Sequence, residues 1–143
     1  MKILIINGPN INMTGIRERE IYGSQTYTDL LCIIDTACRD AGADYEVYQS
    51  NHEGDIVDKI QSAYGVTDGI VINAGAYTHT SIAILDALKA VGIPTVEVHI
   101  SDPAKREKFR HISYVSLSAL STVAGLGLDG YRVAIEKLRE YIK

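Results

Sequence analysis

Short apolar segments alternate along this chain with segments of helical periodicity, and this alternation limits the folds available to it. The apolar segments fall at residues 3–6, 45–49, 69–73 and 95–101, with a weaker one near 112–115. Strands that are apolar on both faces are typical of a parallel sheet covered by helices. Five such strands in 143 residues predict one α/β domain over 1–143, a flavodoxin-like, doubly wound five-stranded parallel sheet with helices on both faces.

Periodic apolar residues predict four helices between and after these strands. We expect the first to begin at Thr28 as its N-cap and to end at Gly42, with its apolar face at positions 30, 33, 34, 37, 38 and 41. The others are expected at 56–64, 82–91 and 131–142, each with one apolar face. Four helices are enough to cover both faces of the sheet.

The composition excludes several classes of protein. A net charge of −4 argues against non-specific nucleic-acid binding, which needs a basic surface. The apolar run at 3–6 is too short for a signal-peptide core or a membrane span. Cys32 and Cys38 belong to no C-x-x-C motif, so we expect buried, reduced thiols. These features indicate a cytoplasmic protein that binds neither nucleic acid nor membranes.

Polar residues gather where the predicted strands end. In an open parallel sheet the ligand binds at the carboxyl ends of the strands. The first strand leads into Asn7-Gly8-Pro9-Asn10, the third leads into the segment from Asn73 to His79, and the fourth ends at Ser101. Asn and Gly also form turns and cap helices, so the first of these segments, taken alone, supports a turn as well as a site.

The fourth strand carries the more specific signal. Glu97, His99 and Ser101 alternate with the apolar residues Val96, Val98 and Ile100 and therefore share one face. A carboxylate two residues before a histidine can hold one ring nitrogen and leave the other free for proton transfer. The alternatives are an edge strand with a solvated face and a histidine with a structural role.

About twenty residues without periodicity separate the first strand from the first helix. Loops of this length in a compact domain are usually functional, and this one has the features of an active-site lid. It contains Tyr22 close to Arg17 and Arg19. A free phenol ionises only near pH 10, and a guanidinium in a sequestered site favours the phenolate. The alternative is a solvated charged loop that Tyr22 anchors to the domain.

Motifs for cofactor chemistry are missing or misplaced. The sequence has no P-loop, no G-x-S-x-G elbow and no metal-ligand spacing among its four histidines. Gly125-x-Gly127-x-x-Gly130 has the spacing of a dinucleotide motif but comes too late for a βαβ unit to follow it. We therefore expect chemistry without a metal or cofactor, performed by Tyr, His, Asn and Arg side chains.

The sequence closely resembles the type II 3-dehydroquinate dehydratase family. Six segments in family order, which extend over nearly the whole chain, carry this resemblance: Asn7–Asn10, Glu20–Gly23, Gln49–Gly54, Asn73–Ser81, Glu97–Ser101 and Phe109–His111. The resemblance implies a cofactor-free lyase of the shikimate and quinate pathways. It would dehydrate 3-dehydroquinate reversibly to 3-dehydroshikimate through an enolate, in a homododecamer built as four trimers.

The resemblance also implies a role for each site residue. Tyr22, ionised with help from Arg17, would be the base, and Asn10 would hold a water that stabilises the enolate. His99, oriented by Glu97, would be the acid. The implied substrate-binding residues are Asn73, His79, Asp86, Ile100, Ser101 and Arg110, with Asp86 reaching the site of a neighbouring subunit.

Two segments depart from the usual family pattern. Arg19 stands where the family usually has proline, so either Arg17 or Arg19 could act on Tyr22. Residues 102–105 also differ from the usual family pattern, beside the expected carboxylate-binding residues.

Two other functions stay open at this level: a flavodoxin-like nucleotide or flavin enzyme, and a non-catalytic relative that only binds a polyhydroxy acid.

Overall fold

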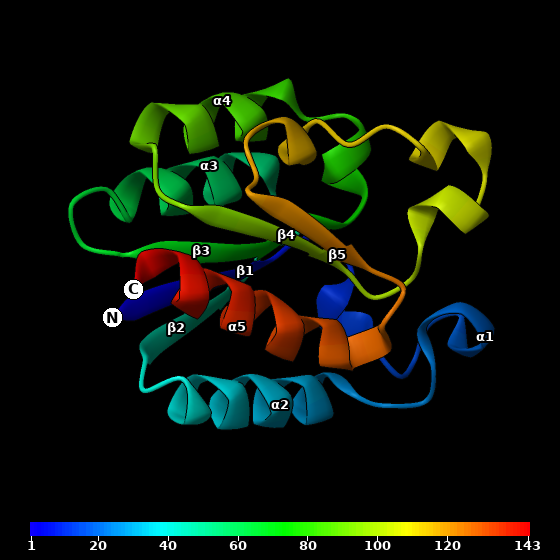
Figure 1. Cartoon of the computed structure of the whole chain (residues 1–143). Helices are drawn as coiled ribbons and strands as arrows, with labels where there is room; N and C mark the ends of the chain where they lie inside the picture. Colours follow the sequence, from blue (N-terminus) through cyan, green and yellow to red (C-terminus); the bar gives the residue numbers. More distant parts are fainter.

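The computed structural model describes residues 1–143 as three layers, with a sheet between two layers of helices (Figure 1). All neighbouring strands are parallel, in the order β2-β1-β3-β4-β5. The strands are β1 (Lys2–Asn7), β2 (Asp44–Gln49), β3 (Gly69–Asn73), β4 (Thr95–His99) and β5 (Ser121–Ala124). The predicted flavodoxin-like, doubly wound sheet is confirmed.

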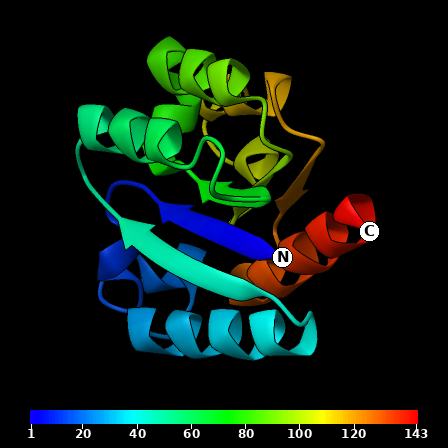
Figure 2. The same cartoon turned by 90° about the vertical axis from the view of Figure 1, so that its left-hand side faces the viewer.

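Two pairs of helices cover the sheet. Helices α2 (Tyr27–Asp40) and α5 (Gly130–Ile142) lie on one face, and α3 (Glu53–Ser62) and α4 (Ile82–Val91) lie on the other (Figure 2). Strand β1 shows why both faces need a cover, because alternate apolar side chains enter two separate cores. Ile3 and Ile5 pack with α2 and α5, whereas Leu4 and Ile6 pack with α3 and α4.

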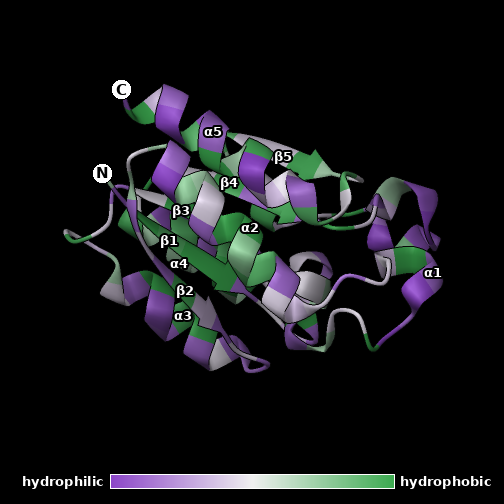
Figure 3. Cartoon of the chain, turned by 90° about the horizontal axis from the view of Figure 1, so that it is seen from below, coloured by the Kyte–Doolittle hydropathy of each residue, from purple (hydrophilic) through white to green (hydrophobic).

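The distribution of apolar residues matches this layering. In Figure 3 strand β1 is hydrophobic, whereas α2 and α5 carry both hydrophilic and hydrophobic residues. A strand with both faces covered is apolar throughout, and a helix on the surface is apolar on one side only. None of the helices combines the length and apolar character that crossing a bilayer would require.

Helix α2 begins two residues earlier than its expected cap. Thr26, not Thr28, is the N-cap, and the prediction of Thr28 is wrong. The backbone N–H of Asp29 donates to Thr26 Oγ1 at 3.2 Å, and the N–H of Thr26 donates to Asp29 Oδ2 at 2.8 Å. This reciprocal capping box needs an acidic or amide side chain three residues after the cap, and Asp29 supplies it only for Thr26.

Two side chains expected in the core are exposed. Cys32 lies on the outer side of α2, and only Cys38 is buried; both thiols are free. Tyr64 follows the end of α3 and is 70% exposed. Leu30, Ile34 and Cys38 fill the buried side of α2, which leaves Cys32 outside. Helix α3 ends at Ser62, so Tyr64 does not continue its apolar face.

The predicted strand near 112–115 is wrong, and the fifth strand lies later, at Ser121–Ala124. The side chain of Ser113 accepts a hydrogen bond from the N–H of Ser116 at 3.1 Å, which favours a turn over a strand ladder. Val115 is buried, but in a 3₁₀ turn. Strand β4 also ends at His99, two residues before the predicted end, so that Ser101 belongs to the loop that follows.

Candidate active site

A cavity of about 150 Å³ opens at the carboxyl ends of β1, β3 and β4, where the doubly wound fold predicts a ligand. Most of the predicted site residues line it: Asn10, Arg17, Tyr22, Asn73, His79, His99, Ile100, Ser101 and Arg110. Glu97 lies behind His99, with which it makes a hydrogen bond. Asp86 is exposed on α4 and does not line this cavity.

The loop after β1 is held close to the loop after β3. A Cβ atom on Gly8 would lie 2.4 Å from the carbonyl oxygen of Ala74, so only glycine fits there. Asn10 has a left-handed backbone, with φ of 68°, and its N–H donates to Asn51 Oδ1 at 3.1 Å. The segment therefore forms a tight turn and also lines the cavity, so its turn residues and its position at the cavity are compatible.

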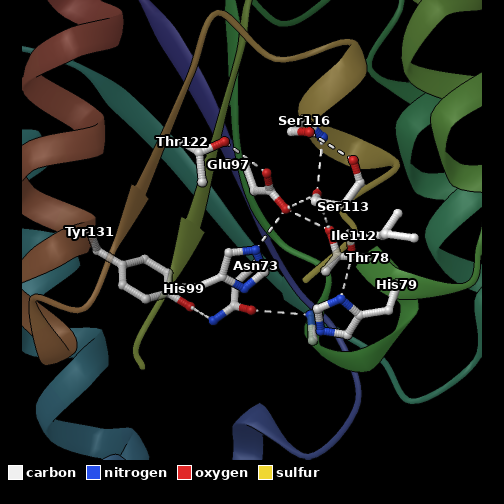
Figure 4. Close-up of polar contacts among 11 residues, drawn as sticks. Asn73, Thr78, His79, Glu97, His99, Ile112, Ser113, Ser116, Thr122 and Tyr131 are labelled. Atoms are coloured by element: carbon white, nitrogen blue, oxygen red, sulfur yellow. Dashed lines mark hydrogen bonds and ion pairs between the residues drawn. The ribbon is translucent and has the colours of Figure 1, made fainter. Parts of the chain in front are cut away.

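Glu97 is completely buried in the interior strand β4, between β3 and β5, so the edge-strand alternative is wrong. Its Oε1 accepts hydrogen bonds from Thr78 at 2.5 Å, Ser113 at 2.6 Å and His99 Nε2 at 2.6 Å, and Oε2 accepts one from Thr122 at 2.9 Å (Figure 4). Burial opposes its ionisation, but the His99 imidazole and these hydroxyls outweigh burial and lower the pKa of the Glu97 carboxyl to about 2.

This carboxylate determines which nitrogen of His99 can act in the cavity. An ionised Glu97 can only accept, so His99 Nε2 carries the proton of their 2.6 Å hydrogen bond. Nδ1 is then the nitrogen left for proton transfer. The ring of His79 lies parallel to that of His99, with centroids 6.4 Å apart, and its Nδ1 donates to the carbonyl of Ile112 at 2.6 Å.

Two guanidinium groups converge on the hydroxyl of Tyr22, in the short helix α1 (Arg19–Tyr22). Arg17 Nη2 donates to it at 3.0 Å and Arg106 Nη1 at 2.6 Å. Arg17 also lies over the Tyr22 ring, with Cζ 4.1 Å from the centroid. Arg19 instead donates to the carbonyl of Gly15 at 2.9 Å. The cations at Tyr22 are thus Arg17 and Arg106, and Arg19 is not one of them.

The contact of Arg106 with Tyr22 is a feature of the site that the sequence analysis did not assign. Arg106 is 84 residues from Tyr22, and it follows a 3₁₀ turn at Pro103–Lys105 whose first N–H groups are capped by Asp102. Asp102 Oδ1 accepts from the N–H of Ala104 at 3.0 Å. The departure from the usual family pattern at 102–105 therefore forms an ordered turn, and Arg106 Nη1 also reaches Ser101 Oγ at 3.3 Å. The sequence feature that could have indicated Arg106 is its position five residues after Ser101, at the expected substrate-binding segment.

The cavity has the charge pattern of an anion site. Arg17, Arg106 and Arg110 line it, and the charge of the buried Glu97 carboxylate is directed at its own hydrogen-bond donors behind His99. Guanidinium groups bind carboxylates well because their N–H groups form a planar fork. No group of three or more His, Cys, Asp or Glu side chains is arranged to hold a metal ion.

The fold and this cavity define a class of protein: a small flavodoxin-like α/β enzyme whose site combines a tyrosine between guanidinium groups, a carboxylate-held histidine and a lining of arginines. A family model described as dehydroquinase class II matches residues 1–139. The chain belongs to the class II dehydroquinase family, and this contradicts the alternative of a nucleotide or flavin enzyme.

Individual relatives agree with this assignment. The chain is 52% identical over 137 residues to a 3-dehydroquinate dehydratase of Corynebacterium glutamicum, covering 96% of this chain and 94% of the relative. It is 56% identical over 134 residues to catabolic 3-dehydroquinase 1 of Aspergillus terreus, covering 94% and 88%. The crystal structure of the type II dehydroquinase from Butyrivibrio crossotus superposes with a TM-score of 0.94 at 54% identity, covering 96% and 97%.

Proposed function

We propose that this chain catalyses the reversible dehydration of 3-dehydroquinate to 3-dehydroshikimate, with Tyr22 as the base and His99 as the acid. The observation that carries the proposal is the pair of arginines at the Tyr22 hydroxyl, in the same cavity as a histidine held by a buried carboxylate. Family membership supports the overall reaction, and this geometry supports the roles of the residues.

Tyr22 suits the role of base because its oxygen is surrounded by donors. Arg17 and Arg106 both donate N–H groups to it. A phenolate oxygen has no O–H and can accept both of these hydrogen bonds. The phenolate would remove a proton from C2 of the substrate, next to the C3 ketone. The electrons of the C–H bond would then form an enolate, with the charge on the C3 oxygen.

His99 suits the role of acid because the Glu97 carboxylate holds its Nε2 in place and leaves Nδ1 as the nitrogen that can donate a proton. The imidazolium would donate a proton from Nδ1 to the C1 hydroxyl, which leaves as water while the C1–C2 double bond forms. His99 then becomes neutral and Tyr22 is left protonated, so solvent returns one proton from the tyrosine to the histidine to complete the cycle. Asn10 would hold a water that donates to the enolate oxygen, as an oxyanion donor does.

The remaining polar groups of the cavity would hold the substrate. We assign the substrate carboxylate to Asn73, Ser101 and the N–H of Ile100, because these groups cluster at the ends of β3 and β4. His79 and Arg110 would bind the ring hydroxyls. Arg110 is partly neutralised by Glu107, whose carboxylate accepts from its Nε at 2.8 Å, and this leaves its Nη groups for the substrate.

The reaction can be tested directly with purified protein. Mixed with 3-dehydroquinate and no added metal or cofactor, it should produce the ultraviolet absorbance of a conjugated enone. Tight binding of quinate without any absorbance change would instead identify the protein as a non-catalytic binder of polyhydroxy acids.

We also propose that the active form is a homododecamer of four trimers in which Asp86 completes a neighbouring site. Asp86 is exposed on α4, as is Ile82 in the first turn of that helix, and Phe109 and Ile112 are exposed close to Arg110, which lines the cavity. Sedimentation velocity should give about twelve times the 15.6 kDa mass of one chain. A monomer with full activity would contradict both the assembly and the shared site.

A further inference from the structure

Tyr131 is the largest fully buried side chain of the protein, and the proposed chemistry does not use it. It lies in the first turn of α5, beneath the ends of β1 and β3. Its hydroxyl donates to Asn7 Oδ1 at 2.6 Å and accepts from Asn73 Nδ2 at 3.0 Å. We propose that Tyr131 is a positioning residue that locks the Asn73 amide with its nitrogen available to the substrate carboxylate, an inference that rests on the proposed function.

The hydrogen bonds around Asn73 run in one direction. The N–H of Gly75 can only donate, and it points at Asn73 Oδ1 from 3.1 Å. The amide nitrogen of Asn73 must then be the atom that faces Tyr131. The hydroxyl of Tyr131 accepts there and donates its own hydrogen bond to Asn7 Oδ1, so that the bonds run from Gly75 to Asn73, from Asn73 to Tyr131 and from Tyr131 to Asn7.

A flipped Asn73 amide would break this order at both ends. The Gly75 N–H would face an NH₂ group, so two donors would oppose each other. The Tyr131 oxygen would face an amide oxygen, and its single O–H already donates to Asn7. Asn73 and Asn7 are direct partners in the β1–β3 register, so neither side chain can move away without moving its strand. Only the observed orientation satisfies Gly75 and Tyr131 together. The nitrogen of Asn73 carries a second N–H, and Asn73 lines the cavity.

The arrangement gives up stability elsewhere, which argues for a role beyond packing. Asn7 Nδ2 is buried without any hydrogen-bond partner. A buried unsatisfied donor is costly and rare in native structures. Burial also raises the pKa of the Tyr131 phenol, so the proton that fixes the direction of the bonds stays in place throughout the working pH range.

The test compares the steady-state kinetics of Tyr131→Phe with those of Tyr141→Phe. Tyr141 lies on the same helix but is exposed, so its variant controls for the loss of a hydroxyl from α5. Since the Asn73 contact would be present in both the ground state and the transition state, Tyr131→Phe should raise KM by roughly three- to tenfold and leave kcat within about twofold. A merely structural role would lower the melting temperature and the active fraction but leave KM unchanged.

A double-mutant cycle with Asn73→Ala separates the possible routes. If Tyr131 acts through Asn73, adding Tyr131→Phe to Asn73→Ala should raise KM no further. Full additivity of the two effects on KM, or an unchanged KM in Tyr131→Phe, would overturn the inference. Turnover by the wild-type protein is the reference in both experiments: its absence would refute the proposed function, whereas its presence with an unchanged KM would refute the role of Tyr131 alone.

Discussion

The hydroxyl of Tyr22 lies 2.6 Å from Arg106 Nη1, although 84 residues separate the two in the chain. The Arg106 side chain is more buried than that of Arg17, at 12% against 25% exposed, and its hydrogen bond is 0.4 Å shorter than the 3.0 Å bond of Arg17. A buried charge is less screened by solvent and acts more strongly on its neighbour. Arg106 is therefore the dominant cation at the proposed base.

Replacing Tyr22 by phenylalanine removes the oxygen and keeps the ring. If Tyr22 is the base, kcat should fall by roughly 10²- to 10⁴-fold, the usual contribution of a positioned proton acceptor. Binding of quinate, followed by calorimetry, should be largely unchanged because the groups assigned to its carboxylate and hydroxyls are intact. Near-normal turnover by Tyr22→Phe would remove this residue from the mechanism.

The two arginines at Tyr22 should control how the rate depends on pH. Without the Arg106 guanidinium the Tyr22 oxygen loses its shorter charge-assisted hydrogen bond, so the pH of half-maximal rate in Arg106→Ala should rise. Arg17→Ala should shift the profile in the same direction but less, because Arg17 is farther from the oxygen and more exposed. Rate–pH profiles of both variants measure this.

Arg19→Ala is the matched control for these variants. Arg19 is on the same loop but donates to the carbonyl of Gly15, so its removal should leave the pH profile in place. An equal upward shift in Arg19→Ala and Arg106→Ala would mean that general charge on the lid, and not contact with the hydroxyl, favours the phenolate.

His99 should matter more for elimination than for proton removal. In His99→Ala the phenolate can still exchange the C2 proton, but the C1 hydroxyl has no acid to protonate it. Elimination should therefore slow by roughly 10²- to 10⁴-fold, while deuterium from D₂O still enters C2 of the recovered substrate. Mass spectrometry of that substrate gives the exchange rate. Faster loss of exchange than of elimination would contradict the assignment of His99 as acid.

The sequence predicts the sheet well because its signal is local. Apolar segments give four of the five strands, and the alternation of polar and apolar residues on the fourth strand indicates both Glu97 and His99. The fifth strand, Ser121–Ala124, has only one buried residue, Val123, and so lacks the apolar pattern on which the prediction depends. The Ile112–Val115 segment has that pattern, but the Ser113 side chain directs it into a turn.

Contacts between distant segments are what the sequence could not supply. Arg106 reaches Tyr22 only because the turn at 103–105 folds back over the lid, and nothing in the pattern of either segment encodes that approach. The hydroxyls around Glu97 come from three separate segments, at Thr78, Ser113 and Thr122. Such partners are determined by the tertiary fold, and the local pattern gives only the residue that they surround.

Glu97 should make the protein sensitive to acid. The His99 imidazole and the buried hydroxyls lower its pKa from 4.5 to about 2, so its contribution to stability is complete above about pH 4.5 and is lost as the pH falls toward 2. This shift corresponds to about 3 kcal/mol in the free energy of unfolding. In urea unfolding between pH 6 and 2.5, wild type should therefore lose more stability than Glu97→Gln, which has no carboxyl to titrate. Parallel losses in the two proteins would show that other carboxylates cause the acid sensitivity.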